Sequence, residues 1–327
     1  MTKAGGQARV LRIAANVAGC LLLVAAVVVV YGNRGMLAGA WGAAGEAPAW
    51  VFPAIALLPL ANWAITSAIF WTLTRRYGRV GLWEMGALIG SAWLLNMLPF
   101  KPGLVGRVAY HKAISGIPIR TTVLVTLVAL LSGGLGVLAA IGVQVAADSS
   151  LREAVPTDRL LVIAMCFVAG AAVPVILLWV RRGWVVAGSH SGDVAIAVAL
   201  RIVDTHVWAL RYWLAFGLIG QGQPYGVCVI VSGVSQLAGQ FPIQVGVREW
   251  AVGVSTSALR GGAAVSAATV APGMTVDLIG RAAEVVCAIP VGLVSFVWVH
   301  RRLALVGGEA QTRAMGKLPP PSGRMND

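Results

Sequence analysis

Residues 121–146 read TTVLVTLVALLSGGLGVLAAIGVQVA, a run that contains no charged residue. A helix needs about 20 mainly apolar residues to cross the hydrocarbon core of a bilayer, so this run is long enough to span it. The remainder of the 327-residue chain is similar, with 58% hydrophobic and 11% charged residues, whereas soluble domains carry roughly 25% charged residues. The sequence therefore predicts an all-α, polytopic integral membrane bundle and excludes soluble, disordered and disulfide-rich secreted proteins.

Six stretches have the length and composition of full membrane spans. They are 13–31, 50–73, 121–146, 160–180, 194–219 and 275–299. Two further apolar stretches are shorter: 82–98 leads into Pro99 and Pro102, and 224–240 leads into Pro242. If both of these cross the membrane, the chain has eight spans. If both fold back on one side as re-entrant hairpins, over 82–118 and 224–260, it has six.

The distribution of Lys and Arg favours six spans, because cytoplasmic loops of membrane proteins are enriched in these residues. With six spans and both termini cytoplasmic, the inner segments hold 17 of the 25 Lys and Arg residues and the outer segments hold 5. We therefore expect a multi-pass protein of the cell membrane, with a single membrane domain over 1–302 and a disordered polar tail over 303–327. The net charge of +13 then indicates anionic membrane lipids as partners, with no nucleic acid.

The two short stretches are followed by similar sequences, PGLVGRV at 102–108 and PIQVGVR at 242–248. Three full spans separate them, so two hairpins would enter from opposite faces, as in an inverted repeat whose broken helices meet near the midplane. The alternative is that Pro and Gly merely kink ordinary spanning helices. The predicted hairpin-turn residues are Pro102, Gly103, Gly106, Pro242 and Gly246.

Two predicted spans carry charged residues on one helical face, and each such residue at bilayer depth costs about 2.5–3.5 kcal/mol. The first set is Arg201, Asp204 and Arg211 in 194–219, and the second is Asp277, Arg281 and Glu284 in 275–299. One interpretation is that these stripes line a polar cavity that receives a lipid headgroup. The alternative is local self-neutralisation, of Arg201 by Asp204 and of Arg281 by Asp277 and Glu284.

Arg107 and Arg248 each lie next to a glycine at the turn of a predicted broken helix. Helix N-termini together with a guanidinium suit a phosphate or a carboxylate, and Glu249 would fix Arg248 or pair with a cation. The predicted headgroup-binding residues are therefore Arg107, Arg248, Glu249 and Arg281. For Arg107 the alternative is a side chain that extends to the membrane interface.

The sequence carries no HExxH, GxSxG or P-loop motif, and its four cysteines show no metal-ligand spacing. These observations predict no metal, no cofactor and no catalytic activity.

The segment 241–249, FPIQVGVRE, resembles the Pro-Gly-Gly-x-Gly-x-Arg-Glu segment of the lysylphosphatidylglycerol synthase transmembrane region, also called the flippase-like domain family. Leu98 and Pro99 through Gly103 and Arg107 are similar to an earlier segment of that family, and Arg281 is similar to an arginine in its late helix. The resemblance covers roughly residues 10–300. The chain has Ile243 and Gln244 where the family has two glycines, so backbone amides would approach a headgroup less closely.

The resemblance implies a membrane domain that handles phospholipids or polyprenyl-type lipids, in some members moving aminoacylated phosphatidylglycerol between leaflets. In some members a separate soluble domain makes the lipid, and because the sequence predicts a single membrane domain we do not expect lysyl transfer. The first hypothesis is a translocator of an anionic phospholipid or polyprenyl-type lipid. The second is a non-transporting subunit, or a lipid-modifying enzyme of cell-envelope lipid or glycolipid biosynthesis that acts with a protein partner.

Overall fold

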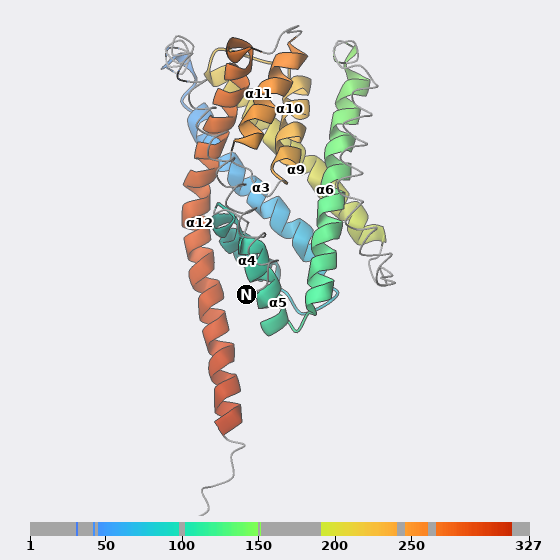
Figure 1. Cartoon of the computed structure of the whole chain (residues 1–327), viewed down its shortest axis with the longest axis vertical. Coiled ribbons are helices and arrows are strands. Elements are labelled where there is room, and N and C mark those ends of the chain that lie inside the picture. The colour runs from blue at the N-terminus through green and yellow to red at the C-terminus, as the bar shows by residue number, and fades with distance from the viewer. Residues whose placement is uncertain are drawn as a thin grey trace, which may run out of the picture.

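The computed structural model of the chain describes residues 31, 42, 45–97, 102–149, 151, 191–240, 246–260 and 266–315. In these residues the protein is all-helical and contains no strand (Figure 1). The helices are α3 (Val51–Thr74), α4 (Leu82–Leu95), α5 (Pro102–Ala113), α6 (Ile119–Ala147), α9 (Ser191–Leu218), α10 (Tyr225–Ala238), α11 (Val247–Leu259) and α12 (Ala267–Met315).

Three of the described helices are long and apolar enough to cross a membrane: α3, α6 and the Ala267–Leu305 part of α12. At 1.5 Å per residue, the 24 residues of α3 extend roughly 36 Å, against a hydrocarbon core of about 30 Å. Six full spans are not shown by the described residues. Helix α9 has 28 residues but carries four charged residues, and the predicted spans 13–31 and 160–180 lie outside the described residues except for Tyr31.

Among the described residues, many large apolar side chains lie on the surface and several charged side chains lie in the interior. Large apolar side chains such as Trp83, Val105 and Val294 are more than two-thirds exposed. Arg211 and Asp277 are almost completely buried. Extensive exposed apolar surface marks contact with a membrane or a partner. Together with the three candidate spans, this distribution identifies a helical membrane protein.

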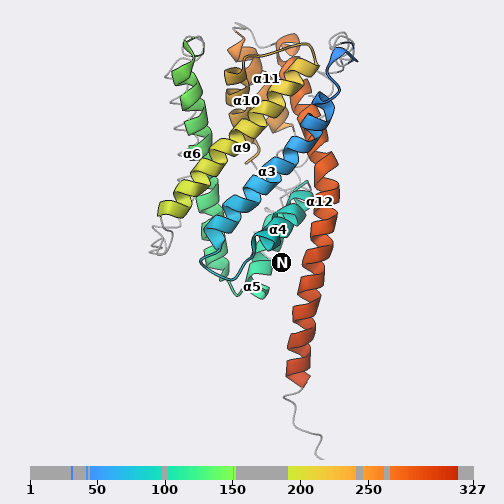
Figure 2. The ribbon, with the colours of Figure 1, turned by 180° about the vertical axis from the view of Figure 1, so that it is seen from behind.

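Two pairs of short helices, α4–α5 and α10–α11, occupy the residues predicted for the hairpins. With 12 to 14 residues each, these helices extend about 18–21 Å, which is too short to cross a hydrocarbon core. Both views show α10 and α11 at one end of the long axis and α4 and α5 toward the other (Figures 1 and 2).

Each pair of short helices begins and ends on the same side of the molecule. Val80, before α4, and Ile117, after α5, belong to one buried apolar cluster. At the other end, Arg260 after α11 donates a hydrogen bond to the side-chain oxygen of Gln221 before α10, at 2.8 Å. The chain therefore enters and leaves each helical hairpin at one end of the bundle.

The start of the first hairpin is held by α3. Trp63 and Trp71 donate indole N–H hydrogen bonds to the carbonyls of Gly86 and Val80, at 3.0 and 3.1 Å. The Glu84 carboxylate accepts the Gly81 N–H at 3.4 Å and satisfies one of the free donors at the N-terminus of α4.

The predicted turn residues of the first hairpin lie inside α5 rather than in a turn. The connection between α4 and α5 is 96–101, and Pro102 is the first residue of α5, where its missing N–H is tolerated. Gly103 faces α4, and a β-carbon there would collide with the backbone of Ala92. Gly106 is also helical, and a β-carbon there would meet open space.

In the second hairpin, Gly246 immediately precedes α11 with φ = +87° and ψ = −49°, a conformation that side-chain-bearing residues avoid. The Glu249 carboxylate accepts the Gly246 N–H at 2.8 Å. Pro242, the other predicted turn residue, lies outside the described residues.

Helix α12 has 49 residues and projects past the other helices at one end (Figures 1 and 2). It continues to Met315, into the stretch from residue 303 for which composition predicts disorder. Leu, Glu, Ala, Gln and Arg in this stretch are good helix formers and continue an established helix easily.

Candidate functional site: a neutral central cluster and a separate arginine

Arg211 of α9 and the charged residues of α12 are joined through Arg248 of α11. Glu284 of α12 accepts from Arg211 Nη2 of α9 at 2.7 Å and from Arg248 Nη1 of α11 at 3.1 Å. One carboxylate therefore bridges a long helix and an arm of the second hairpin.

Asp277, one of the deepest charges, is 0% exposed. Arg248 Nε lies 2.9 and 3.0 Å from its two carboxylate oxygens. The Tyr212 hydroxyl and, at 3.4 Å, the Ser235 hydroxyl donate to the same carboxylate. Asp277 is thus held by donors from α9, α10 and α11.

Glu249 and Arg281 pair differently from the sequence-based prediction. Arg281 Nε of α12 lies 2.5 Å from Glu249 Oε1 of α11, and Glu249 is completely buried. Glu249 is thus paired with Arg281, and Arg248 is paired with Asp277 and Glu284. The reason is that α11 packs along α12, while Asp277 is already occupied by Arg248 and Tyr212.

These contacts define a central cluster of three arginines and three carboxylates, whose formal charges cancel. Its members are Arg211, Arg248, Arg281, Glu249, Asp277 and Glu284. The guanidinium carbons of Arg211 and Arg248 lie 4.2 and 5.1 Å from the ring centroid of Trp208, so this indole adds a cation–π contact. Arg211 Nη1 and Arg248 Nη2 are buried without a hydrogen-bond acceptor among the described residues.

Arg201 and Asp204 form the intrahelical pair that the self-neutralisation alternative predicts, at 2.8 Å. Asn62 of α3 donates a second hydrogen bond to Asp204, at 2.7 Å. The stem of Arg201 passes over Gly136 of α6, where a β-carbon would collide with it. This pair therefore connects α3, α6 and α9 and is separate from the central cluster.

Arg107 lies apart in the first hairpin and is 6% exposed. Its Nη2 donates to the Thr126 hydroxyl of α6 at 2.6 Å, and its guanidinium carbon lies 3.9 Å from the ring centroid of Phe70 of α3. Among the described residues no carboxylate forms an ion pair with it. The guanidinium is enclosed by α3, α5 and α6 rather than extended from the surface of the described residues.

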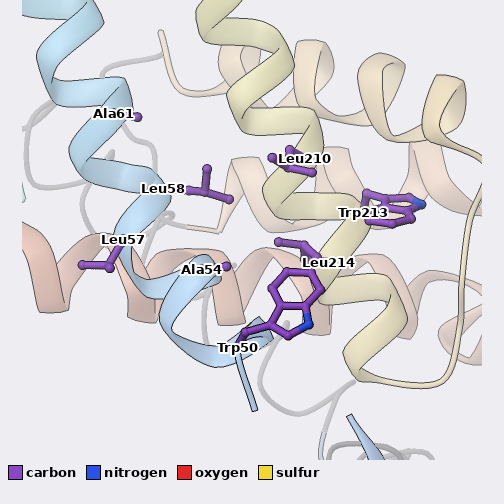
Figure 3. A pocket seen from close by; sticks show the side chains of 8 residues that line it. All are labelled: Trp50, Ala54, Leu57, Leu58, Ala61, Leu210, Trp213 and Leu214. Carbon is purple, nitrogen blue, oxygen red and sulfur yellow. The ribbon is translucent and has the colours of Figure 1, made fainter. Parts of the chain in front are cut away.

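A groove of about 300 Å³ lies between α3 and α9 (Figure 3). Its walls are Trp50, Ala54, Leu57, Leu58, Ala61, Leu210, Trp213 and Leu214. The lining is apolar, and none of the charged residues predicted for a polar cavity belongs to it.

Asn62, Ser235, Tyr212, Phe70 and Thr126 contribute to these contacts and were not predicted from sequence. Asn62 and Ser235 are polar residues inside apolar runs, a pattern that marks inward-facing positions. Tyr212 follows Arg211 directly. Phe70 carries no sequence signal, because an aromatic residue in a membrane span is ordinary.

Within the described residues, no group of three or more His, Cys, Asp or Glu side chains is placed to hold a metal ion. Comparisons with known protein families, with curated proteins and with solved structures found no match to this chain.

Proposed function

We propose that this protein moves an anionic phospholipid or a polyprenyl-type lipid between the leaflets of the cell membrane. In this proposal the bundle has six full spans and two re-entrant hairpins, and both termini are cytoplasmic. The observation that carries the proposal is the placement of two short helical hairpins at opposite ends of one bundle, with buried arginines on both. The motifs that resemble the flippase-like domain family give the proposal independent support.

The physical argument concerns the charge of the headgroup. A phosphate that enters the hydrocarbon core loses its hydration, and it crosses only where fixed positive groups replace the water. Hairpins that end at half depth bring backbone ends into the middle of the membrane, which is tolerated only beside protein or a wet cavity. Such hairpins and buried guanidinium groups provide an interior route for a headgroup.

The apolar groove between α3 and α9 suits the hydrocarbon chains of the proposed lipid substrate. It opens on the outer surface of the bundle, where Trp50 and Leu57 are more than half exposed (Figure 3). Hydrocarbon chains on this surface stay in an apolar environment while a headgroup passes through the interior.

Surface charge supports the proposed orientation. The end of the bundle that holds the connections of the first hairpin carries Arg75, Arg76, Arg79, Lys112, Arg120, Arg301 and Arg302. At the opposite end, the described connections carry Arg260 as their one basic residue. The positive-inside rule assigns the first end to the cytoplasm.

The test uses the full chain in vesicles that contain fluorescently labelled phosphatidylglycerol in both leaflets. A membrane-impermeant reductant quenches only the outer leaflet, so protein-free vesicles retain about half of the fluorescence. We expect vesicles with the protein to lose nearly all of it, and labelled phosphatidylcholine to be exchanged more slowly. Retention of half of the phosphatidylglycerol signal in protein-containing vesicles would exclude leaflet exchange.

The neutrality of the central cluster favours a second candidate, a non-transporting subunit or a lipid-modifying enzyme that works with an envelope-biosynthesis partner. Arginines that are already paired are suited to holding helices together. This candidate predicts no exchange in vesicles, and formation of a modified lipid when purified protein, partner and lipid donor are combined.

A further inference from the structure

We infer that Arg107 of the first hairpin binds a phosphate-type monoanion, and that the arginines of the central cluster do not. The inference deepens the proposed function by assigning the anion to one hairpin. The second hairpin is then the structural half of the protein.

The first step is an account of charge. Six buried or half-buried carboxylates of the described residues accept from another side chain: Glu84 from Tyr110, Asp193 from Arg75, Asp204 from Arg201, Glu249 from Arg281, Asp277 from Arg248, and Glu284 from Arg211. Asp148, which is half-buried, accepts the Leu151 N–H. Residues 98–101, which precede α5, are Leu-Pro-Phe-Lys and contain no acid. Arg107 is thus a buried cation without a carboxylate among the described residues.

The second step is energetic. Taking a charged group out of water without a counter-ion costs several kcal/mol even after relaxation. The Phe70 ring face and the Thr126 hydroxyl are neutral, so they offset only part of this cost. A guanidinium has five N–H donors, and an anionic oxygen would give them charge-assisted hydrogen bonds as well as the missing negative charge.

The third step is the contrast with the central cluster. There three guanidinium groups already face three carboxylates, so an added anion would leave a net negative charge in a low-dielectric interior. Arg248 in particular is shared between Asp277 and Glu284.

The surroundings of Arg107 also fit a lipid. Leu104 and Val105, which precede Arg107 on α5, are 41% and 69% exposed, so α5 presents an apolar outer face and a buried cation within one helical turn. A lipid whose hydrocarbon chains lie along this apolar face would therefore have its phosphate close to Arg107.

The experiment supplies Arg107 with an internal counter-ion. Thr126→Asp places a carboxylate where the hydroxyl now accepts from Arg107, and Thr126→Asn is the neutral control of similar size. Binding of phosphatidylglycerol and of phosphatidylcholine to the purified full-length protein is counted by native mass spectrometry. We expect the wild type and Thr126→Asn to prefer phosphatidylglycerol, and Thr126→Asp to lose that preference by about tenfold, which corresponds to roughly 1.4 kcal/mol.

If Thr126→Asp does not fold, the unfolding temperature of a second variant, Arg107→Gln, tests the same inference. Arg107→Gln removes the buried charge, so it should unfold at a higher temperature than wild type in phosphatidylcholine micelles. Phosphatidylglycerol should raise the unfolding temperature of the wild type and not that of Arg107→Gln. Inorganic phosphate is tested in the same way, and stabilisation by it that depends on Arg107 would support the anion site with a soluble ligand.

A folded Thr126→Asp or Arg107→Gln protein with wild-type preference for phosphatidylglycerol would overturn the inference, and so would equal loss of preference in Thr126→Asn. The proposed function fails separately. Arg107-dependent binding without leaflet exchange by wild type would retain the site and remove translocation. Exchange that Arg107→Gln leaves unchanged would retain translocation and remove the site.

Discussion

At the scale of single residues, the protein shows that an arginine takes its role from its neighbours. Arg107 and Arg248 follow similar Pro-x-x-Val-Gly segments and are both buried. Arg248 is bound to two carboxylates, whereas Arg107 faces a hydroxyl and an aromatic ring. Arg248 is an element of internal structure, whereas Arg107 is the residue that we infer binds an anion.

Arg248→Ala should therefore destabilise the whole protein, an effect larger than the loss of headgroup binding that the sequence-based role of Arg248 implies. Removal of one partner leaves Asp277 uncompensated in the interior, and such losses reach about 3–5 kcal/mol. We expect a clear fall in the thermal unfolding temperature in detergent. The double variant Arg248→Met/Asp277→Asn, which removes one charge of each sign, should unfold at a higher temperature than the single variant. A single variant as stable as wild type would contradict the structural role.

Asn62→Leu should also destabilise the fold, because it removes a 2.7 Å hydrogen bond to the buried Asp204 carboxylate. Hydrogen bonds to charged groups contribute about 1.5–3 kcal/mol. The control is Ser67→Ala on the same helix, which removes only the bond from the Ser67 hydroxyl to the Trp63 carbonyl one turn earlier. Equal unfolding temperatures for the two variants would contradict a special role for Asn62.

At the scale of elements, proline and glycine begin helices here as well as interrupting them. Pro102 was predicted to lie in a turn, but it begins α5, since the first helical position tolerates the missing N–H. Gly246 does mark a helix boundary, where φ is +87°. The apolar composition of the short stretches predicted a helical hairpin. The position of the turn between its two helices depended on contacts between these helices.

Gly246→Ala should destabilise the second hairpin by about 1–3 kcal/mol, because a side chain is strained at this φ and ψ. Gly106→Ala is the matched control in the first hairpin, where the backbone is helical and a β-carbon meets open space. It should be neutral or stabilise by about 0.4–1 kcal/mol, since alanine restricts the unfolded chain. The measurement is the unfolding temperature of both variants in the same detergent. A lower unfolding temperature for Gly106→Ala than for Gly246→Ala would contradict the backbone conformations given for these two glycines.

At the scale of the whole molecule, the opposed hairpins set which connections share a side of the membrane. The connections that flank α4 and α5 lie at one end of the bundle, and those that flank α10 and α11 lie at the other (Figure 1). If α4 crossed the membrane by itself, positions before α4 and after α5 would be on opposite sides.

Single cysteines at Arg79, Ala113, Gly222 and Ser266, in a chain whose native cysteines are replaced, test this arrangement. In intact cells a membrane-impermeant maleimide should label Gly222→Cys and Ser266→Cys, whereas Arg79→Cys and Ala113→Cys should react only after permeabilisation. All four positions are exposed on the surface of the protein, so protection from the maleimide would report the side of the membrane rather than burial inside the protein. Opposite accessibility of Arg79→Cys and Ala113→Cys would contradict a re-entrant first hairpin.

The sequence by itself determined the helical membrane class, the two broken segments and the inward direction of the charged stripes. These properties follow from local composition. A long uncharged run is stable as a helix across the membrane, and a charged residue at bilayer depth is stable only when it faces the protein interior. Only the tertiary structure decided which charges neutralise which. The partners of Arg248, Arg211 and Arg281 come from other helices, and the packing of helices that are far apart in sequence sets these distances. The same packing leaves Arg107 with Phe70 and Thr126 as its described neighbours.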